Sequence, residues 1–486
     1  MKYTFRLIIA ALAAAVVLVS CAKELNPGKV DTDPADGTLR TVAVSFDTPT
    51  KSYLDGRQPC FSQGDSILVS DFSGLDTCVV KLMGKQTIIK TKLKGSHLKA
   101  VYPYTAAKIA DDNKDINDVK IPAIQTGRFA DANICMADQK LENNFECLVF
   151  RNKVAILKFY ADETIGVDAI KVSCSAEDIA YNSTKITVFA PESDDSQEPD
   201  PFEDPRIWYV AMKDIKEATS LTFESTTKTQ EPVTKTPKAA PGGDNSIVKG
   251  CIYNVFIPYY IEVNVGTDLA PIYQKWAYCN VGAFLPEEPG YYFAWGDTRG
   301  YKYDDETYKF EDDHIFNWKD CPFNNGSETY NSEFFSNIKN DVCPNGILDL
   351  KYDAANANWG DKWRMPTNAE YNQLVSGTNT DKTDVFSKGG YINLRIRGTN
   401  LIFPPSGNGY EYGLTNPYSN GVYWSSNLDD KFDNLATVFL FQDTGTMSMT
   451  FDRYVGHTIR PIYDETITDD KTVNVTISAY TSGGTL

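Results

Sequence analysis

The stretch Trp359-Gly360-Asp361-Lys362-Trp363-Arg364-Met365-Pro366-Thr367-Asn368-Ala369-Glu370 decides the fold of the C-terminal part of the chain. The pair Pro366-Thr367 predicts the start of a helix, because the threonine can cap it and Glu370, three residues on, completes a capping box. Tyr371 and Leu374 then share the helix face that we expect to enter the core. The stretch therefore predicts a capped helix packed against a core rich in tryptophan.

Tryptophan is concentrated in this part of the chain. Six of the seven Trp residues lie beyond residue 262. Trp359, Trp363 and Trp424 are large enough to hold together a fold rich in loops, so the favoured interpretation places them in the core. The alternative is that they form a platform on which sugars stack.

Further aromatic and glycine-containing segments surround this stretch in a fixed order. They occupy residues 276–283, 291–298, 401–407, 423–426 and 456–461. The ordered set resembles the Fibrobacter succinogenes major paralogous (FISUMP) domain over about residues 270–463. The resemblance implies an α+β, C-type-lectin-like domain, which we expect at residues 263–463.

Residues 364–370 also echo a segment of the formylglycine-generating enzymes, which share that fold. Those enzymes use cysteines in the C-terminal part of the domain, and this sequence has no Cys after Cys343. Motifs of the GxSxG, HExxH and P-loop types are absent from the sequence as well. We therefore expect no catalytic residue, no enzyme activity and no cofactor.

The region from residue 41 to 262 consists of short alternating runs separated by glycine-marked turns. Val42, Val44 and Phe46 alternate as a half-buried strand should, and a second block of strands opens at Phe150. The segments 102–104, 121–125, 150–152 and 253–255 occur in an order that resembles fimbrillin-like (Mfa-like) lipoproteins of Bacteroidales. That resemblance implies two tandem β-sandwich subdomains, at residues 41–149 and 150–262. Many members of the family are pilus stalk, anchor or tip subunits, and others are surface lipoproteins.

The N-terminal segment predicts export and a lipid anchor. Lys2 and Arg6 precede an apolar run that is too short to span a bilayer comfortably, and Leu18-Val19-Ser20-Cys21 resembles the lipobox of bacterial lipoproteins. We expect residues 1–20 to be a signal peptide and Cys21 to carry lipid. Residues 21–40 form a polar linker that ends at Arg40, a candidate site for proteolytic maturation, although an ordinary surface arginine is the simpler interpretation.

Composition and charge limit the partners. The net charge is −18 and the pI is about 4.7, so a nucleic acid would be repelled. Frequent Tyr, Phe, Gly and Pro without helical heptads favour a mainly β protein. The charge suits a soluble protein exposed at the cell surface, and the lipoprotein resemblance implies that a lipid anchors it in the outer membrane.

Cysteines and acidic residues offer few sites. Nine cysteines remain after Cys21, none in a CxxC motif, and Cys321 with Cys343 is the favoured candidate for a disulfide. The acidic clusters 304–306, 311–313 and 429–430 could supply oxygen ligands for Ca²⁺, but solvated loops are the favoured interpretation. We therefore expect no metal site.

The tail at residues 464–486 contains one clear alternating strand, 472–479. It could pair within its own chain, which is slightly favoured, or insert into the sheet of a neighbour as a donor strand.

Taken together, these features predict a surface-exposed lipoprotein that acts as a tip or accessory fimbrial subunit or adhesin, with the lectin-like domain used for recognition. Its partners would be other fimbrial subunits, or a glycan or protein on a host or bacterial surface, with the membrane engaged through the lipid anchor. The alternative is a non-pilus, glycan-binding lipoprotein of the outer membrane. In that case the candidate ligand-facing aromatics are Tyr410, Tyr412, Tyr418 and Trp424.

Overall fold

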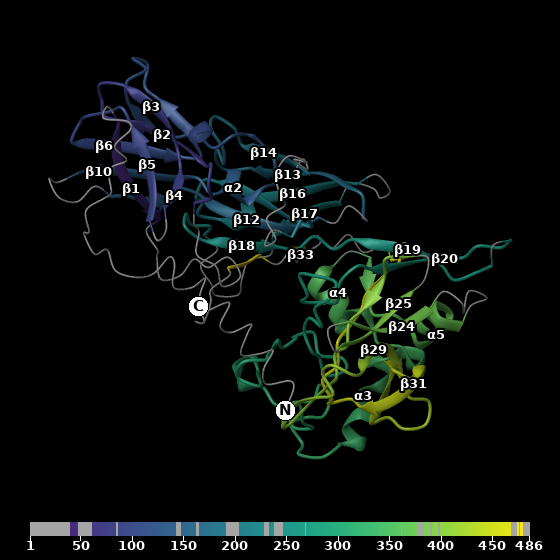
Figure 1. Cartoon of the computed structure of the whole chain (residues 1–486). Helices are drawn as coiled ribbons and strands as arrows, with labels where there is room; N and C mark the ends of the chain where they lie inside the picture. The colour runs from purple at the N-terminus through teal and green to yellow at the C-terminus, as the bar shows by residue number, and fades with distance from the viewer. Residues whose placement is uncertain are drawn as a thin grey trace. The chain divides into compact units, whose positions relative to one another are not determined.

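The protein, described here from a computed structural model, divides into two compact units (Figure 1). The first takes in the chain up to Asp162, Val167–Val255 and Thr476–Leu486, and the second Glu163–Gly166 and Phe256–Val475. The structure describes residues 39–46, 61–83, 86–141, 147–161, 165–190, 204–227, 233–237, 246–267, 269–360, 362–376, 383–388, 391–396, 399–467, 474–475 and 477–479. The chain is mainly β, as the sequence predicts.

The first unit begins with an eight-stranded sheet in the order β3-β2-β6-β10-β11-β1-β5-β4. Its strands are β1 (Arg40–Phe46), β2 (Ser66–Ser70), β3 (Leu75–Val79), β4 (Lys81–Met83), β5 (Gln86–Thr91), β6 (His97–Tyr102), β10 (Cys135–Lys140) and β11 (Cys147–Asn152). A separate hairpin joins β7 (Ala107–Ile109) to β8 (Ile116–Val119). In β1, Val42 and Val44 are buried and Phe46 packs against the same core, which confirms the predicted alternation.

This sheet closes on itself through one short segment. β3 and β4 are separated only by Val80, yet β3 pairs with β2 at one end of the strand order and β4 with β5 at the other. Val80 is fully buried, and the enclosed core is aliphatic and aromatic, with Ile67, Ile89, Leu98 and Phe150 among its members. The two faces of the closed sheet therefore pack on each other as in a β-sandwich.

A second pair of sheets completes the first unit. One runs in the order β15-β12-β18-β34, and the strands of the other include β17, β16, β13, β14 and β9 in sequence across the sheet. Phe159 and Phe223, from the two sheets, are fully buried with ring centroids 5.6 Å apart. The strands are β9 (Ile124–Gln125), β12 (Ala155–Tyr160), β13 (Val167–Cys174), β14 (Lys185–Phe189), β15 (Ile207–Met212), β16 (Leu221–Thr227), β17 (Val233–Pro237), β18 (Ile252–Val255) and β34 (Ile477–Ala479), with the short helix α2 (Phe129–Ala132).

The two ends of the four-stranded sheet are covered in different ways. At one end β34 pairs antiparallel with β18, with Asn254 opposite Ser478. The tail strand therefore pairs within its own chain in this structure. At the other end the side chain of Gln125 takes the place of a strand, because its Nε2 donates to the Ala211 carbonyl at 2.7 Å and its Oε1 accepts from the Ala211 N–H at 2.8 Å.

Over the residues that the structure describes, the second unit combines small sheets with three α-helices. The helices are α3 (Ser332–Val342), α4 (Ala354–Trp359) and α5 (Asn368–Ser376). One sheet has the order β19-β20-β32-β23, built from β19 (Tyr260–Asn264), β20 (Tyr273–Ala277), β32 (Ile462–Tyr463) and β23 (Trp363–Arg364). The pairing of β19 with β20 places the start of this unit at Phe256, a few residues before the predicted boundary at 263.

The remaining strands of the second unit form two three-stranded sheets and two hairpins. The sheets are β29 (Gly421–Leu428), β30 (Leu435–Gln442) and β31 (Gly445–Asp452), and β24 (Thr383–Lys388), β25 (Tyr391–Ile396) and β26 (Ile402–Phe403). The hairpins are β21 (Tyr303–Asp304) with β22 (Lys309–Phe310), and β27 (Asn408–Tyr410) with β28 (Gly413–Thr415). The unit also holds the two-residue strand β33 (Asn474–Val475).

Tryptophan fills the core of this unit, as predicted. Trp359, Trp363 and Trp424 are 4%, 1% and 0% exposed and belong to one buried cluster. A second cluster contains Tyr371 and Leu374, at 0% and 6% exposed. The core interpretation of the tryptophans and the inward face of the helix are therefore confirmed.

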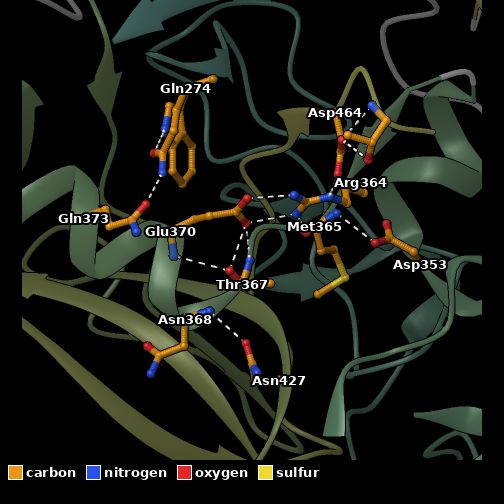
Figure 2. A network of polar contacts seen from close by, with 12 residues as sticks. Gln274, Asp353, Arg364, Met365, Thr367, Asn368, Glu370, Gln373, Asn427 and Asp464 are labelled. Carbon is orange, nitrogen blue, oxygen red and sulfur yellow. Dashed lines mark hydrogen bonds and ion pairs between the residues drawn. The ribbon is translucent and has the colours of Figure 1, made fainter. Parts of the chain in front are cut away.

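The capping box also forms as predicted, and it is part of a larger polar network (Figure 2). Thr367 Oγ1 accepts from the Glu370 N–H at 3.3 Å, and Glu370 Oε2 accepts from the Thr367 N–H at 2.7 Å. Arg364 donates to both oxygens of Glu370 and, through Nε, to Asp464 at 2.7 Å. The network ties the start of α5 to the strands β23 and β32, which supports a scaffold role for this stretch.

A candidate ligand-binding cavity in the second unit

A cavity of about 540 Å³ lies within the second unit. Its walls come from loops that are far apart in the sequence. The lining residues are Gly282, Glu287, Glu288, Pro289, Gly290, Tyr292, Lys302, Tyr303, Asp305, Asn393, Pro405, Leu414, Pro417 and Tyr418. The volume lies in the range of about 300–1,000 Å³ that is usual for small-molecule sites.

The inner wall is anchored to the core by Tyr292 and Ser406. Tyr292 is 1% exposed, and its hydroxyl donates to the Ser406 carbonyl at 2.6 Å. The Ser406 hydroxyl in turn donates to the Val422 carbonyl at 3.0 Å and accepts from the Val422 N–H at 2.9 Å. Since Val422 lies in β29, this wall is held to a buried strand of the unit.

Gly407 brings two cavity loops into close contact. Its φ is +63°, and a Cβ there would lie 2.3 Å from the Thr415 carbonyl oxygen and 3.0 Å from the Pro417 Cα. The N–H groups of Ser406 and Gly407 both donate to the Asn420 carbonyl at 2.9 Å. Glycine is therefore required where the loop of Pro405 meets the loop that carries Pro417 and Tyr418.

A third loop, residues 282–290, is fixed by its own hydrogen bonds. Glu288 Oε2 accepts from the backbone N–H groups of Phe284 and Leu285 at 2.7 and 3.3 Å. Asn280, fully buried, donates through Nδ2 to the Pro289 carbonyl at 2.9 Å. The carboxylate of Glu288 thus stabilises the loop through hydrogen bonds. The part of the cavity rim that this loop forms is therefore pre-formed in the absence of a ligand.

The lining offers both aromatic surface and polar groups. Tyr303 packs edge-on against Phe310, with centroids 5.0 Å apart, and burial raises the pKa of its phenol, which stays protonated. Asp305 is exposed and has no hydrogen-bond or ion-pair partner among the residues that the structure describes. Lys302 Nζ is likewise without such a partner within the described part of the chain. The Asn393 side chain, also in the lining, is nearly buried, at 9% exposed.

This set of side chains offers apolar faces and hydrogen-bonding groups to a ligand. The described lining residues include no His, Cys, Ser or Thr. Tyrosine rings supply apolar faces, and carboxylate, amide and ammonium groups supply acceptors and donors for a polyhydroxylated ligand. The cavity is therefore a candidate recognition site.

The four aromatic residues predicted to face a ligand lie in different environments. Tyr418 lines the cavity and is 46% exposed. Tyr412 is 93% exposed at the tip of the β27–β28 hairpin, and Tyr410 is half-buried; neither lines the cavity.

The prediction for Trp424 is wrong. Its side chain is fully buried, and Nε1 donates to the Phe293 carbonyl at 2.7 Å. His457, also fully buried, packs edge-on against it with ring centroids 4.5 Å apart. Trp424 lies in the middle of β29, where every residue from Gly421 to Ser426 is buried, so it cannot face a ligand.

Sequence reasoning missed Tyr303, Asp305, Glu287 and Asn393 as members of the site. Asp305 was noted only as part of the acidic cluster 304–306, for which solvated loops were favoured. Asp304 accepts from the Glu306 N–H and the Thr307 hydroxyl at 2.8 Å each, which is the hydrogen bonding of an ordinary exposed turn. The signal that could have been used was the closeness of that cluster to Tyr303 in the sequence.

The predicted disulfide between Cys321 and Cys343 is not formed in this structure, because both residues are buried free thiols. Cys321 Sγ donates to the Pro322 carbonyl at 3.5 Å, and Cys343 Sγ donates to the Lys339 carbonyl at 3.3 Å. Among the residues that the structure describes, no three His, Cys, Asp or Glu side chains come together as a metal ion requires.

Of the N-terminal predictions, Cys21, the signal peptide and almost all of the linker lie outside the described residues. Arg40 is described, as the first residue of β1. It is half-buried, and its Nη1 donates to the Gly95 carbonyl at 2.7 Å. No helix in the described part of the chain is both long and apolar enough to cross a membrane.

Comparison with known proteins gives no family assignment. No family model and no curated protein matches the chain. A protein from Bacteroides uniformis assigned provisionally to cell adhesion aligns at 12% identity over 50% of this chain and 97% of its own, with a TM-score of 0.27. The tip fimbrial protein Mfa3 of Porphyromonas gingivalis, with a C-terminal truncation, aligns at 11% identity over 39% and 87%, with a TM-score of 0.21. A fimbrial assembly protein from Parabacteroides distasonis aligns at 14% identity over 44% and 88%, with a TM-score of 0.22. At such TM-scores these alignments carry no argument about this chain.

Proposed function

We propose that this chain is a surface-exposed lipoprotein that serves as a tip or accessory fimbrial subunit or adhesin, with recognition performed by its second unit. The observation that carries the proposal is the cavity of about 540 Å³, whose walls are interlocked loops with tyrosine and carboxylate side chains on the rim. Loops held on a rigid scaffold are the usual place for recognition. The sheets of the first unit would form the platform that carries this site.

The sequence supplies the remaining support. The lipobox at Cys21 would attach the chain to the outer membrane, and the segments between 41 and 262 resemble fimbrillin-like lipoproteins. The segments between about 270 and 463 resemble the FISUMP domain, whose lectin-like fold is used for binding. A fimbrillin-like platform at 41–262 and a lectin-like recognition domain at 263–463 together define an adhesin.

The test is adherence of cells that display the full chain. Tyr418→Ala combined with Asp305→Asn removes one aromatic and one charged group from the cavity without touching the buried core. We expect adherence to fall to the level of cells without the protein, while Tyr412→Ala, outside the cavity, leaves adherence unchanged. Equal adherence of cavity variants and wild type, at equal surface display, would contradict the proposal.

Intact mass and N-terminal sequence of the mature protein from its native envelope test the anchor. A lipid-modified N-terminus at Cys21 supports an anchored surface protein. An unmodified N-terminus at Thr41 supports proteolytic maturation after Arg40 and incorporation into a fimbrium. In that case β1 stays in the sheet, since it lies C-terminal to the cut except for Arg40 itself.

A non-pilus glycan-binding lipoprotein of the outer membrane is the second candidate. The exposed ring of Tyr418 and the ring of Tyr303, both in the lining, favour it. Fractionation separates the two candidates, because a fimbrial subunit co-purifies with sheared fibres and a non-pilus lipoprotein stays with the membrane.

A further inference from the structure

We infer that the cavity binds the terminal residues of an uncharged saccharide and rejects saccharides that bear carboxylates. The inference rests on the proposed recognition function and adds the class of ligand. It follows from the aromatic surface, the hydrogen-bonding groups and the charge of the lining.

The aromatic surface comes from two tyrosines, Tyr418 on a loop and Tyr303 in β21. Tyr418 is 46% exposed, and its loop is held where Gly407 touches Thr415. Tyr303 is fixed between Phe310, at 5.0 Å, and the backbone of Leu414, which hydrogen-bonds its hydroxyl. Such rings present flat apolar faces at low entropic cost, and the C–H faces of a pyranose ring pack on them.

The polar groups of the lining match hydroxyl chemistry. Asp305 has both carboxylate oxygens available among the described residues, and each can accept from a sugar hydroxyl. Lys302 supplies donors for ring or hydroxyl oxygens, and the lining also contains Asn393, which is 9% exposed. A ligand with many adjacent hydroxyl groups uses acceptors and donors together, which an apolar ligand does not.

The charge of the lining sets the selectivity. The lining contains three carboxylates, from Glu287, Glu288 and Asp305, and one ammonium, from Lys302. Asp304 adjoins the site, and hydrogen bonds from Glu306 and Thr307 hold its pKa below the ordinary value, so it is ionised as well. The whole chain carries a charge of −18. A sialic acid or uronic acid would therefore meet like charges at short range, which is unfavourable.

The experiment is a glycan array probed with the full-length mature chain, in which each neutral oligosaccharide is paired with its sialylated or uronic-acid counterpart. Three variants accompany the wild type. Tyr418→Ala removes stacking, and Glu287→Gln combined with Asp305→Asn neutralises the rim. Asp443→Asn, an exposed residue of the β30–β31 turn outside the lining, is the charge control. Equal melting temperatures establish that the variants are folded.

We expect wild type and Asp443→Asn to bind neutral oligosaccharides and to bind the acidic partners at least about tenfold more weakly, as a like-charge contact near a protein surface implies. Tyr418→Ala should weaken neutral binding at least about tenfold, in line with the loss of a stacking aromatic. The variant with the neutralised rim should show a smaller ratio of affinity for neutral saccharides to affinity for acidic ones. For wild type, 1 M salt should reduce the same ratio, because the Debye length falls to about 3 Å.

Two results would overturn the inference. Preferential binding of acidic saccharides by wild type would overturn the ligand class, while leaving a recognition function for the cavity intact. Absence of binding to every saccharide, with cavity-dependent adherence to cells retained, would transfer the site to a protein ligand. Loss of the proposed function itself would show separately, as adherence that does not depend on the cavity.

Discussion

Arg364 and Glu370 form a two-pronged ion pair, with Nη1 2.9 Å from Oε2 and Nη2 2.6 Å from Oε1. Both side chains are about one-fifth exposed, at 21% and 19%. Figure 2 shows that the same arginine reaches Asp464, so one guanidinium joins α5 to β23 and to the residue after β32. The guanidinium therefore joins two consecutive elements, β23 and α5, to a residue 100 positions further along the chain.

Removing the guanidinium is expected to destabilise the second unit. Arg364→Met leaves the partly buried carboxylates of Glu370 and Asp464 without their cation, and we expect a loss of about 2–4 kcal/mol in the free energy of unfolding. Tryptophan fluorescence during denaturation measures it, because six of the seven Trp residues lie beyond residue 262. Lys309→Ala breaks the exposed Lys309–Asp313 pair and serves as a control that should change little.

The same network predicts how stability depends on pH. Burial alone would raise the pKa of Glu370, but hydrogen bonds and charge from Arg364 outweigh it and hold the pKa below the ordinary value of 4.5. A lowered pKa means stability that is present above the unfolded value and lost as pH falls below about 4.5. Burial raises the pKa of Asp353 to about 6, so its protonation between pH 6 and 4 favours the fold. We therefore expect maximal stability near pH 5 from these two groups, measured by denaturation from pH 7 to 3. In Arg364→Met, the loss of stability as the pH falls below about 4.5 should become smaller. An unchanged loss of stability in this pH range would contradict the attribution to the Arg364–Glu370 pair.

The burial of Trp424 gives a third prediction. Trp424→Phe deletes the hydrogen bond to the Phe293 carbonyl and leaves a small void, at an expected cost of about 1–3 kcal/mol. Tyr412→Ala, at the exposed hairpin tip, should leave stability unchanged. If Trp424→Phe instead weakened ligand binding with no change in stability, the core assignment would be incorrect.

The side chain of Gln125 is expected to contribute to the stability of the first unit. Gln125→Ala leaves the N–H and the carbonyl of Ala211 unpaired at the edge of β15, and we expect a loss of about 2–4 kcal/mol. Gln125→Glu is the matched comparison, because a carboxylate can accept from the N–H but cannot donate to the carbonyl. Its stability at pH 7 should lie no higher than that of wild type, and the melting temperature of the full chain measures both.

Gly407 links stability to the shape of the cavity. Gly407→Ala places a Cβ against the Thr415 carbonyl in a backbone conformation with φ of +63°, so we expect a cost of about 1 kcal/mol or more and a displaced Tyr418 loop. Calorimetry measures the loss of stability, and saccharide binding reports the displacement of the Tyr418 loop. Gly326→Ala, at φ +70° with no heavy atom within 4 Å of the added Cβ, isolates the backbone strain from the steric contact.

Local patterns in the sequence were sufficient to predict single helices and strands. They were not sufficient to predict contacts between residues that are far apart in the chain. The capping box of Thr367 and Glu370 and the alternation of Val42 and Val44 depend on residues a few positions apart, so their chemistry is visible in the sequence. The cavity joins Tyr303 and Asp305 to Tyr418, and only the folded loops bring those segments together. For the same reason the sequence left two roles open for Trp424, a favoured core position and a ligand-facing one, because an aromatic residue in a strand has no mark that separates a core face from a ligand face. The free thiols of Cys321 and Cys343 depend on loop geometry that spacing does not reveal.

The pairing of β34 with β18 also governs when the first unit can be finished. β34 follows the whole second unit in the chain, so the ribosome delivers it after the second unit has been synthesised. Until then the edge of β18 presents unpaired N–H and carbonyl groups, which are a template for pairing with another chain. The unit that is synthesised first is therefore the last to complete its sheet. Until β34 has paired with β18, a newly made chain must be kept from pairing with other chains through this edge.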